Sequence, residues 1–379
     1  MATQACDSRK SRPAPIPVWN SSRTVKRVIL VASLFFLLLL WCSAWPGAPL
    51  AAQSPPSQSR SQTTVPLGIA LESYPYPYPV HFLEFEMEGQ LVRMAYMDIP
   101  ASAPANGQTV VLLHGKNFGG YYWENTIHVL GDAGYRVVVP DQIGWGKSSK
   151  PDLRYSFSRL AANTARLLDA LGVHQIVLLG HSTGGMLAVR FARTYPQRVI
   201  ALVLEDPIGL EDYRLRIPPQ TDETLFRDEL KNTDAEKIRA FYAHYFAHPA
   251  ADIYGPLAEV QIRVAQSGEF PRWAKSSALA YQMIYEQPVL YDYRLLQPPT
   301  LLIVGQEDHV VPLSAYASEE VKATLGHVVE LAGQAINEVP HGALIVIPDA
   351  GHIPHIEQPG RFHQAVLNFL EQHPGSQHP

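Results

Sequence analysis

Residues 176–184 read Ile-Val-Leu-Leu-Gly-His-Ser-Thr-Gly, an apolar run that passes directly into a turn carrying Ser182. Residues 185–192 follow with the spacing of a helix. A strand, a sharp turn with a serine and then a helix is the context in which a G-x-S-x-G sequence forms a nucleophile elbow. The glycines at 180 and 184 allow the strand and the helix to approach closely, because they lack a Cβ. Ser182 is therefore the candidate nucleophile.

Three further apolar runs precede residues that could assist Ser182. These runs are residues 109–113, 300–304 and 344–347. The first ends in His-Gly-Lys, the second in Gly-Gln-Glu-Asp308 and the third in Pro-Asp-Ala-Gly-His352. Nucleophile, acid and base thus occur in the order Ser182, Asp308, His352, each just past the end of an expected strand. This order is the one expected on an open α/β sheet, where ligands bind at the carboxyl ends of the strands.

Two more segments extend the pattern. Residues 141–149 read Asp-Gln-Ile-Gly-Trp-Gly-Lys-Ser-Ser, and residues 351–359 read Gly-His-Ile-Pro-His-Ile-Glu-Gln-Pro. Together with the elbow they resemble the motifs of the α/β-hydrolase family, over about residues 82–379. The resemblance implies an α/β fold with a mostly parallel central sheet, helices on both faces and a helical cap inserted between strands 6 and 7. It also implies a Ser-Asp-His triad made of Ser182, Asp308 and His352.

The same resemblance places the oxyanion hole at the main-chain N–H groups of Lys116 and Thr183. We expect the Lys116 side chain itself to face solvent or the mouth of the pocket. Asp206 is a rival for the role of the acid, because some hydrolases of this fold place it at the end of strand 6. Asp308 is preferred because it follows its strand at the family's usual place.

Other polar residues near these motifs are expected to be structural. His114 and His181 should brace the loops by hydrogen bonds, and Glu357 should anchor the loop that carries His352. The fifteen histidines are scattered, and none forms a helical metal-binding pattern with an acid. We therefore expect no metal and no cofactor.

The chain divides into four expected regions. Residues 81–206 and 298–379 form the hydrolase core, beginning with a hairpin of strands 82–87 and 91–97. Core helices are expected at 157–171, 182–195 and 359–372. In residues 207–297 the regular alternation of strand-like segments and helices stops and aromatic residues are frequent, which predicts the helical cap. Most of these rings should hold the cap together, while a few shape an apolar pocket over the nucleophile.

The first 52 residues are typical of an export signal or an N-terminal anchor. A basic stretch ends at Arg27, residues 28–45 carry no charge, and small residues follow. Cleavage after the apolar run predicts a periplasmic or secreted protein, whereas an uncleaved run could hold it in a membrane. The two cysteines, Cys6 and Cys42, both lie in this leader. Residues 53–80 are rich in Ser and Pro, and we expect a flexible linker there. Within it, the alternating Tyr and Pro of residues 74–79 are expected to be extended and to pack against the domain surface.

Charge and residue chemistry narrow the function. The first 52 residues hold six of the 30 Lys and Arg and one of the 35 Asp and Glu, so the rest has a formal net charge of −10. This balance disfavours a nucleic-acid partner. A serine at position 182 excludes dehalogenases and epoxide hydrolases, which need a carboxylate nucleophile there.

The leading hypothesis is a serine esterase that cleaves small to medium carboxylic esters or lactones through an acyl-enzyme on Ser182. One alternative is an amide or C–C bond hydrolase with the same triad. A third reading, a non-catalytic ligand-binding protein, is disfavoured by the complete set of Ser182, Asp308 and His352.

Overall fold

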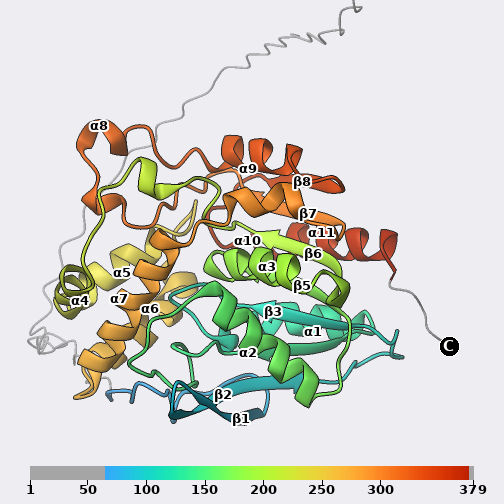
Figure 1. Ribbon diagram of the computed structural model, residues 1–379, viewed down its shortest axis with the longest axis horizontal. Helices are drawn as coiled ribbons and strands as arrows, with labels where there is room; N and C mark the ends of the chain where they lie inside the picture. The colour runs from blue at the N-terminus through green and yellow to red at the C-terminus, as the bar shows by residue number, and fades with distance from the viewer. Residues whose placement is uncertain (1–64, 375–379) are drawn as a thin grey trace, which may run out of the picture. The chain divides into compact units, whose positions relative to one another are not determined.

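Eight strands form one sheet in the computed structural model, which describes residues 65–374. Their order is β1-β2-β4-β3-β5-β6-β7-β8 (Figure 1). The strands are β1 (Val80–Met87), β2 (Gln90–Ile99), β3 (Thr109–Leu113), β4 (Arg136–Pro140), β5 (Ile176–His181), β6 (Val199–Glu205), β7 (Thr300–Gly305) and β8 (Gly342–Ile347). β2 pairs with β1 and β4 in antiparallel fashion, and β3 to β8 are all parallel to one another. The expected fold class and opening hairpin are confirmed.

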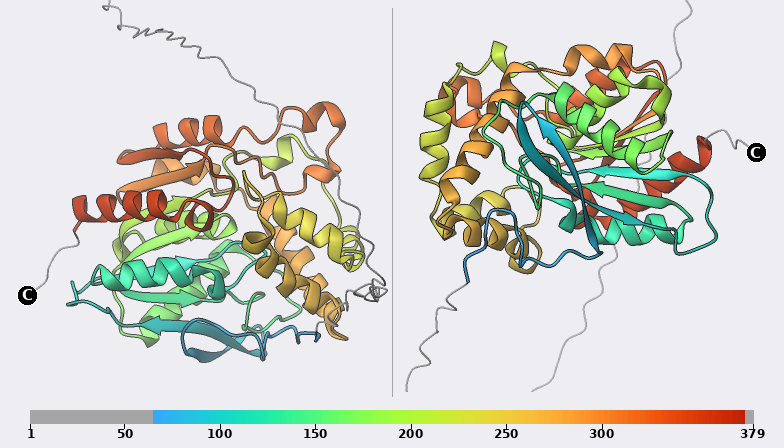
Figure 2. Two further views of the ribbon diagram at one scale, coloured as in Figure 1. Left: turned by 180° about the vertical axis from the view of Figure 1, so that it is seen from behind. Right: turned by 60° about the horizontal axis from the view of Figure 1, so that its bottom comes forward.

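Helices cover both faces of this sheet. In Figure 1, α2 (Phe157–Ala170) and α3 (Thr183–Thr194) lie in front of it, and the reverse view in Figure 2 shows α1 (Glu124–Asp132) and α11 (Pro359–Gln372) on the other face. α9 (Val328–Asn337) packs into the same core as α2 and α3. Successive side chains of a strand point alternately into the core on one face of the sheet and the core on the other. Because both faces are covered, the sequence of such a strand is an unbroken apolar run.

The helices begin and end close to the expected residues. α2 starts at Phe157 because the Ser156 hydroxyl accepts a hydrogen bond from the Arg159 N–H at 3.1 Å, which caps the first turn. α3 and α11 lie within a residue of their expected bounds.

Residues 207–297 contain four α-helices and no strand, as expected for a cap. These are α4 (Asp222–Leu230), α5 (Ala235–Ala243), α6 (Ala251–Ala265) and α7 (Phe270–Glu286). α4 packs on α7 and α5 packs on α6, and the four helices lie together beside one edge of the core layers (Figure 1). Side chains of Thr221 and Asp234 cap the starts of α4 and α5.

Residues 65–79 are not a flexible linker, so the linker expected over residues 53–80 is wrong there, whereas the expected packing of residues 74–79 against the domain is confirmed. The Leu67 and Leu71 side chains are buried, and Tyr74 and Tyr76 meet the Tyr121 ring edge-on, with ring centres 5.1 and 5.7 Å apart. The Leu67 N–H donates to the Arg263 carbonyl of α6, 3.1 Å away. The Ser and Pro content hid apolar side chains at alternate positions, which fit a groove between core and cap. We call residues 65–79 the strap.

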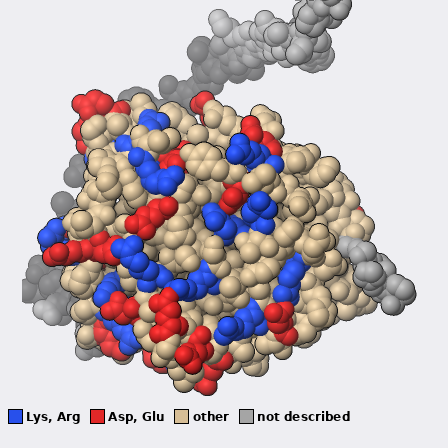
Figure 3. All heavy atoms as spheres, in the orientation of Figure 1, with Lys and Arg blue, Asp and Glu red and all other residues tan. Residues whose placement is uncertain are grey.

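The expected export signal or anchor over residues 1–52, and the linker up to residue 64, lie outside the described residues. Within residues 65–374, no helix combines the length and apolar character needed to cross a bilayer. On the face shown in Figure 3, Lys and Arg are interspersed with Asp and Glu, without a broad patch of one sign.

Candidate active site

Ser182 lies at a sharp turn between β5 and α3. Its φ of 56° and ψ of −118° are unusual for a residue with a Cβ, and such backbone strain costs on the order of 1–3 kcal/mol. The turn is tight because its glycines leave no room for a side chain. A Cβ on Gly184 would overlap the Leu113 carbonyl oxygen of β3, and one on Gly180 would overlap the Gly184 carbonyl. The strained turn holds the serine hydroxyl at the carboxyl end of the sheet.

The structure brings Ser182, His352 and Asp308 together. The His352 Nε2 lies 2.9 Å from Ser182 Oγ, and its Nδ1 lies 2.8 Å from Asp308 Oδ2. All three side chains are buried. With a neutral imidazole, Nδ1–H donates to the carboxylate and Nε2 accepts the serine O–H. This arrangement can draw the proton from the hydroxyl as it attacks a carbonyl carbon.

Asp206 does not contact His352 by a hydrogen bond but lies against Asp308. Its Oδ1 accepts the Gly305 N–H at 2.9 Å. Burial first, and then the neighbouring Asp308 charge, raise the pKa of Asp206 well above its usual value. Burial alone would also raise the pKa of Asp308, but His352 and hydrogen bonds from His352 and Asp206 lower it. These opposite directions favour the protonated form of Asp206 and the carboxylate form of Asp308, which is the one that faces His352.

Asp206, Asp308 and His352 offer possible metal-ligand atoms within 4.8 Å of one another. Both Asp308 oxygens already have hydrogen-bond partners. Asp308 Oδ2 faces His352 Nδ1, and Asp308 Oδ1 accepts the Val310 N–H at 2.9 Å. Asp308 is therefore bonded as a carboxylate that orients His352 rather than as a metal ligand.

The loop that carries His352 is held by the cap. The His352 N–H donates to the Tyr245 carbonyl, 2.7 Å away. The Glu357 carboxylate accepts the Gly351 N–H at 2.7 Å and, from the cap, the N–H groups of Ala247 and His248 at 3.2 and 2.8 Å. Glu357 thus anchors this loop, as expected, and also ties it to the cap.

His181 and His114 brace the surrounding loops. The Tyr122 hydroxyl accepts the Gly115 N–H at 3.0 Å and lies 2.9 Å from His181 Nδ1, while His181 Nε2 lies 2.7 Å from the His352 carbonyl. Burial lowers the pKa of His181 to about 3, so its ring is neutral and donates through Nε2. His114 Nε2 accepts the Gln142 N–H at 3.0 Å.

A buried pair below the elbow was missed in the sequence. His355 Nδ1 lies 2.9 Å from both Glu205 carboxylate oxygens, and Glu205 Oε1 also accepts the His355 N–H at 2.8 Å. Burial lowers the pKa of His355 to about 3, so the neutral ring donates to Glu205. The Glu205 carbonyl accepts the Ser182 N–H at 3.0 Å, so the pair connects the nucleophile turn to the loop of the base. The only feature of the sequence that could have indicated this pair is Glu205, an acid at the end of the apolar strand β6.

The two expected oxyanion donors lie beside Ser182. Thr183 is the first residue of α3, and the N–H groups of a first helical turn have no acceptor within the helix. The loop before Lys116 is close as well, since a Cβ on Gly115 would lie 3.2 Å from the Ser182 Cβ. The main chain at Thr183 and the loop that leads into Lys116 thus both lie beside Ser182, and the role of their N–H groups stays a prediction.

We expected the Lys116 side chain to face solvent or the mouth of the pocket. It does not face solvent. The side chain is buried under the cap, and its Nζ donates to Ser277 Oγ of α7 at 2.7 Å. The nitrogen also lies 3.6 Å from the centre of the Tyr281 ring. Contacts across 161 residues of sequence decided this orientation.

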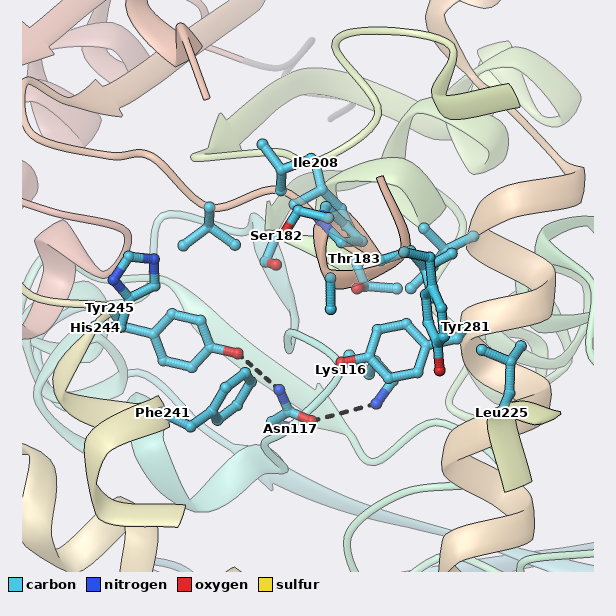
Figure 4. A pocket seen from close by; sticks show the side chains of 18 of the residues that line it. Lys116, Asn117, Ser182, Thr183, Ile208, Leu225, Phe241, His244, Tyr245 and Tyr281 are labelled. Atoms are coloured by element: carbon cyan, nitrogen blue, oxygen red, sulfur yellow. Dashed lines mark hydrogen bonds between the residues drawn. The ribbon is translucent and has the colours of Figure 1, made fainter. Parts of the chain in front are cut away.

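A cavity of about 390 Å³ opens above Ser182, between the core and the cap. Figure 4 shows Ser182 and Thr183 on one side and the cap rings of Phe241, Tyr245 and Tyr281 around the space. These rings are the few that shape the pocket, while others, such as Tyr242 and Phe270, are buried in the cap packing. A small molecule with an apolar body fits a cavity of this size.

Comparison with known proteins agrees with this geometry. Residues 108–359 match the family model described as alpha/beta hydrolase fold. A solved structure from Pseudomonas aeruginosa, provisionally described as a hydrolytic enzyme, is 44% identical, covers 81% of this chain and 98% of its own, and superposes with a TM-score of 0.79.

Two curated relatives match this chain over nearly their full length. A Bacillus subtilis protein, provisionally named 2-succinyl-6-hydroxy-2,4-cyclohexadiene-1-carboxylate synthase, is 30% identical over 74% of this chain and 95% of its own. A 2-hydroxy-6-oxononadienedioate/2-hydroxy-6-oxononatrienedioate hydrolase from Paraburkholderia phymatum is 28% identical over 75% of this chain and 93% of its own. The chain therefore belongs to the α/β-hydrolase family.

Proposed function

We propose that this protein is a serine hydrolase that cleaves small to medium carboxylic esters, lactones included, through an acyl-enzyme on Ser182. The observation that carries the proposal is the hydrogen-bonded series Ser182–His352–Asp308, whose serine lines the cavity under the cap. A binding protein has no need of a strained serine joined to a buried imidazole and carboxylate.

The first half of the reaction forms the acyl-enzyme. Ser182 Oγ attacks the carbonyl carbon while His352 Nε2 takes the hydroxyl proton. The carbonyl oxygen becomes an oxyanion, which the N–H groups of Thr183 and Lys116 would stabilise. The tetrahedral intermediate then collapses, and the leaving alkoxide takes the proton from His352 and departs as an alcohol.

The second half repeats the same steps with water. His352 Nε2 takes a proton from water, the hydroxide attacks the acyl carbon, and the proton returns to Ser182 Oγ as the carboxylic acid leaves. One water is consumed for each ester. Asp308 holds the imidazole in its tautomer and stabilises the imidazolium in both halves.

C–C bond hydrolysis is a second candidate, favoured by the name of the Paraburkholderia relative. Serine attack on a ketone carbonyl forms the same oxyanion, so the same residues serve. The leaving group is then a carbanion, which must be stabilised by a neighbouring carbonyl and receives its proton on carbon. The two candidates differ only in the leaving group.

Substrate profiling separates them. The enzyme comprising residues 65–379 should be assayed on matched pairs in which the same acyl group is attached through oxygen or through the central carbon of a β-diketone. Turnover of the ester with a larger kcat/KM supports the first candidate, and preferential turnover of the diketone supports the second. Absence of turnover in both series would refute both.

We also propose that the enzyme is exported, on the sequence of residues 1–52 alone. A fusion of these residues to a phosphatase that is active only outside the cytoplasm should give activity, and deletion of residues 28–45 should remove it. Sequencing of the mature N-terminus then separates a cleaved signal from an anchor. Activity that survives the deletion would contradict the proposal.

A further inference from the structure

Lys116 is a buried cation without an anionic partner at contact distance. Its Nζ contacts the Ser277 hydroxyl at 2.7 Å, the Asn117 side-chain oxygen at 3.4 Å and the face of the Tyr281 ring. Within residues 65–374, no carboxylate oxygen lies within 4.0 Å of this nitrogen. All its partners are neutral.

A buried charge with neutral partners is costly, since burial removes its hydration. Burial accordingly lowers the pKa of Lys116 to about 8, against the opposite effect of Glu229 on α4. The other charged groups that line the cavity are Asp228, His244 and His309. Asp228 is engaged, because it accepts from Lys231 at 2.9 Å and from the Tyr316 hydroxyl at 2.9 Å. Glu229 is therefore the acid that faces Lys116, from beyond contact distance.

The position of Lys116 links this cation to the reaction centre. Its main chain lies in the loop next to Ser182, while its side chain and Ser182 line the same cavity (Figure 4). An acyl group that is attached to Ser182 and fills this cavity would therefore have Lys116 on its wall. Most of the remaining wall is apolar, with Ile208, Leu225 and Ile284 among the lining side chains.

We propose that the cavity selects acyl substrates that carry a carboxylate, which pairs with Lys116 Nζ while Ser182 attacks the carbonyl. The proposal rests on the proposed function and deepens it. The substrate class is a short half-ester of a dicarboxylic acid, or the corresponding keto acid if the bond cleaved is C–C. The carboxylate supplies the anion that the buried cation lacks, and the apolar wall contacts the methylene chain between the two polar ends.

The test compares two substrates that differ only at the far end of the acyl chain. These are the 4-nitrophenyl half-ester of adipic acid and 4-nitrophenyl hexanoate, in which a methyl group replaces the carboxylate. Lys116→Met should lower the ratio of kcat/KM for adipate over hexanoate by about ten- to a hundredfold, the loss expected for one charge-assisted hydrogen bond. The ratio cancels any effect of the substitution on the oxyanion hole.

Lys150→Met is the matched control. Lys150 is as buried as Lys116, and burial lowers its pKa to about 8 as well, but its Nζ donates to the Gly146 and Ser148 carbonyls outside the cavity. The ratio should stay unchanged in this variant. If Lys116→Met does not fold, Lys116→Gln provides the same comparison. A ratio that is unchanged in the folded Lys116 variant, or that falls equally in both lysine variants, overturns the proposal.

Two further measurements strengthen the test. In the wild type, the ratio should hold below pH 8 and fall above it, because Lys116 loses its proton there while the adipate carboxylate stays ionised. Calorimetry of adipate binding to Ser182→Ala does not depend on turnover, and the added Lys116→Met should weaken that binding by a similar factor. Loss of all turnover would thus refute the proposed function while the adipate binding still decides the Lys116 site.

Discussion

Tyr245 of the cap contacts His352 at two points. Its ring lies on the imidazole, with ring centres 5.3 Å apart and planes 30° from parallel, and its carbonyl accepts the His352 N–H at 2.7 Å. The Tyr245 hydroxyl accepts a hydrogen bond from Asn117 Nδ2, also 2.7 Å away. A residue of the cap therefore positions the base and spans to the loop of the oxyanion donors. The cap completes the catalytic frame in addition to enclosing the substrate.

The first prediction concerns the stacked ring. Tyr245→Leu should lower kcat by about tenfold, because an aromatic contact is worth about 0.5–1.5 kcal/mol and the smaller side chain lets the imidazole move. Tyr245→Phe keeps the ring and should cost less. Phe241→Leu is the control, since Phe241 lines the same cavity without facing His352. It should change KM more than kcat, and equal kcat losses at the two positions would contradict the positioning role.

The second prediction concerns the nucleophile and base. Ser182→Ala and His352→Ala should each abolish turnover apart from the residual rate due to binding and the oxyanion hole. The double variant should be little worse than either, because the residues act as a unit. Mass spectrometry after treatment with a phosphonofluoridate should locate the label on Ser182. A label elsewhere, or full activity in either variant, would remove the assignment.

The third prediction separates the two acids. Asp308→Asn should lower kcat by roughly 10⁴-fold, because an amide stabilises the wrong imidazole tautomer. Asp206→Asn should cost far less, since the amide oxygen can still accept the Gly305 N–H and the neutral amide replaces the neutral carboxyl form that the raised pKa of Asp206 favours. Reversed losses would place the acid at the end of β6.

The fourth prediction concerns the joint between the cap and the base loop. Glu357→Ala removes the acceptor of three N–H groups, and we expect a loss of about 1–3 kcal/mol in stability with a lower kcat. Glu357→Gln keeps one side-chain oxygen and should be milder. Urea denaturation and initial rates provide the two measurements, and an alanine variant with wild-type kcat would show that the joint does not orient His352.

The fifth prediction concerns the strap. Leu67→Ala should destabilise the protein by about 2–5 kcal/mol, as for other fully buried leucines. Val65→Ala, two residues earlier and 71% exposed, is the matched control and should have almost no effect. Urea midpoints measured on both variants decide whether the strap belongs to the folded domain. Equal midpoints would show that it is part of a flexible linker.

Local patterns in the sequence predicted the strands, the main helices, Ser182 and His352, and they favoured Asp308 over Asp206 as the acid. Unbroken apolar runs predicted buried parallel strands, because such strands are covered on both faces. The glycines at 180 and 184 predicted a tight turn at Ser182, because only the absence of a Cβ lets β5, α3 and β3 pass so close. Since the carboxyl ends of parallel strands meet at one edge, Asp308 and His352 could be placed near Ser182 before any distance was known.

The tertiary structure alone decided how side chains meet across long stretches of sequence. Tyr245 reaches Asn117 across 128 residues, and Lys116 reaches Ser277 across 161. The choice between Asp206 and Asp308 likewise depended on which carboxylate faces His352 Nδ1. Hydropathy and spacing describe a residue's neighbours along the chain, whereas these contacts depend on how the cap, the strap and the core pack against one another. Ser182 and His352, with a preference for Asp308 as the acid, could therefore be predicted from the sequence, whereas the shape and charge of the cavity could not.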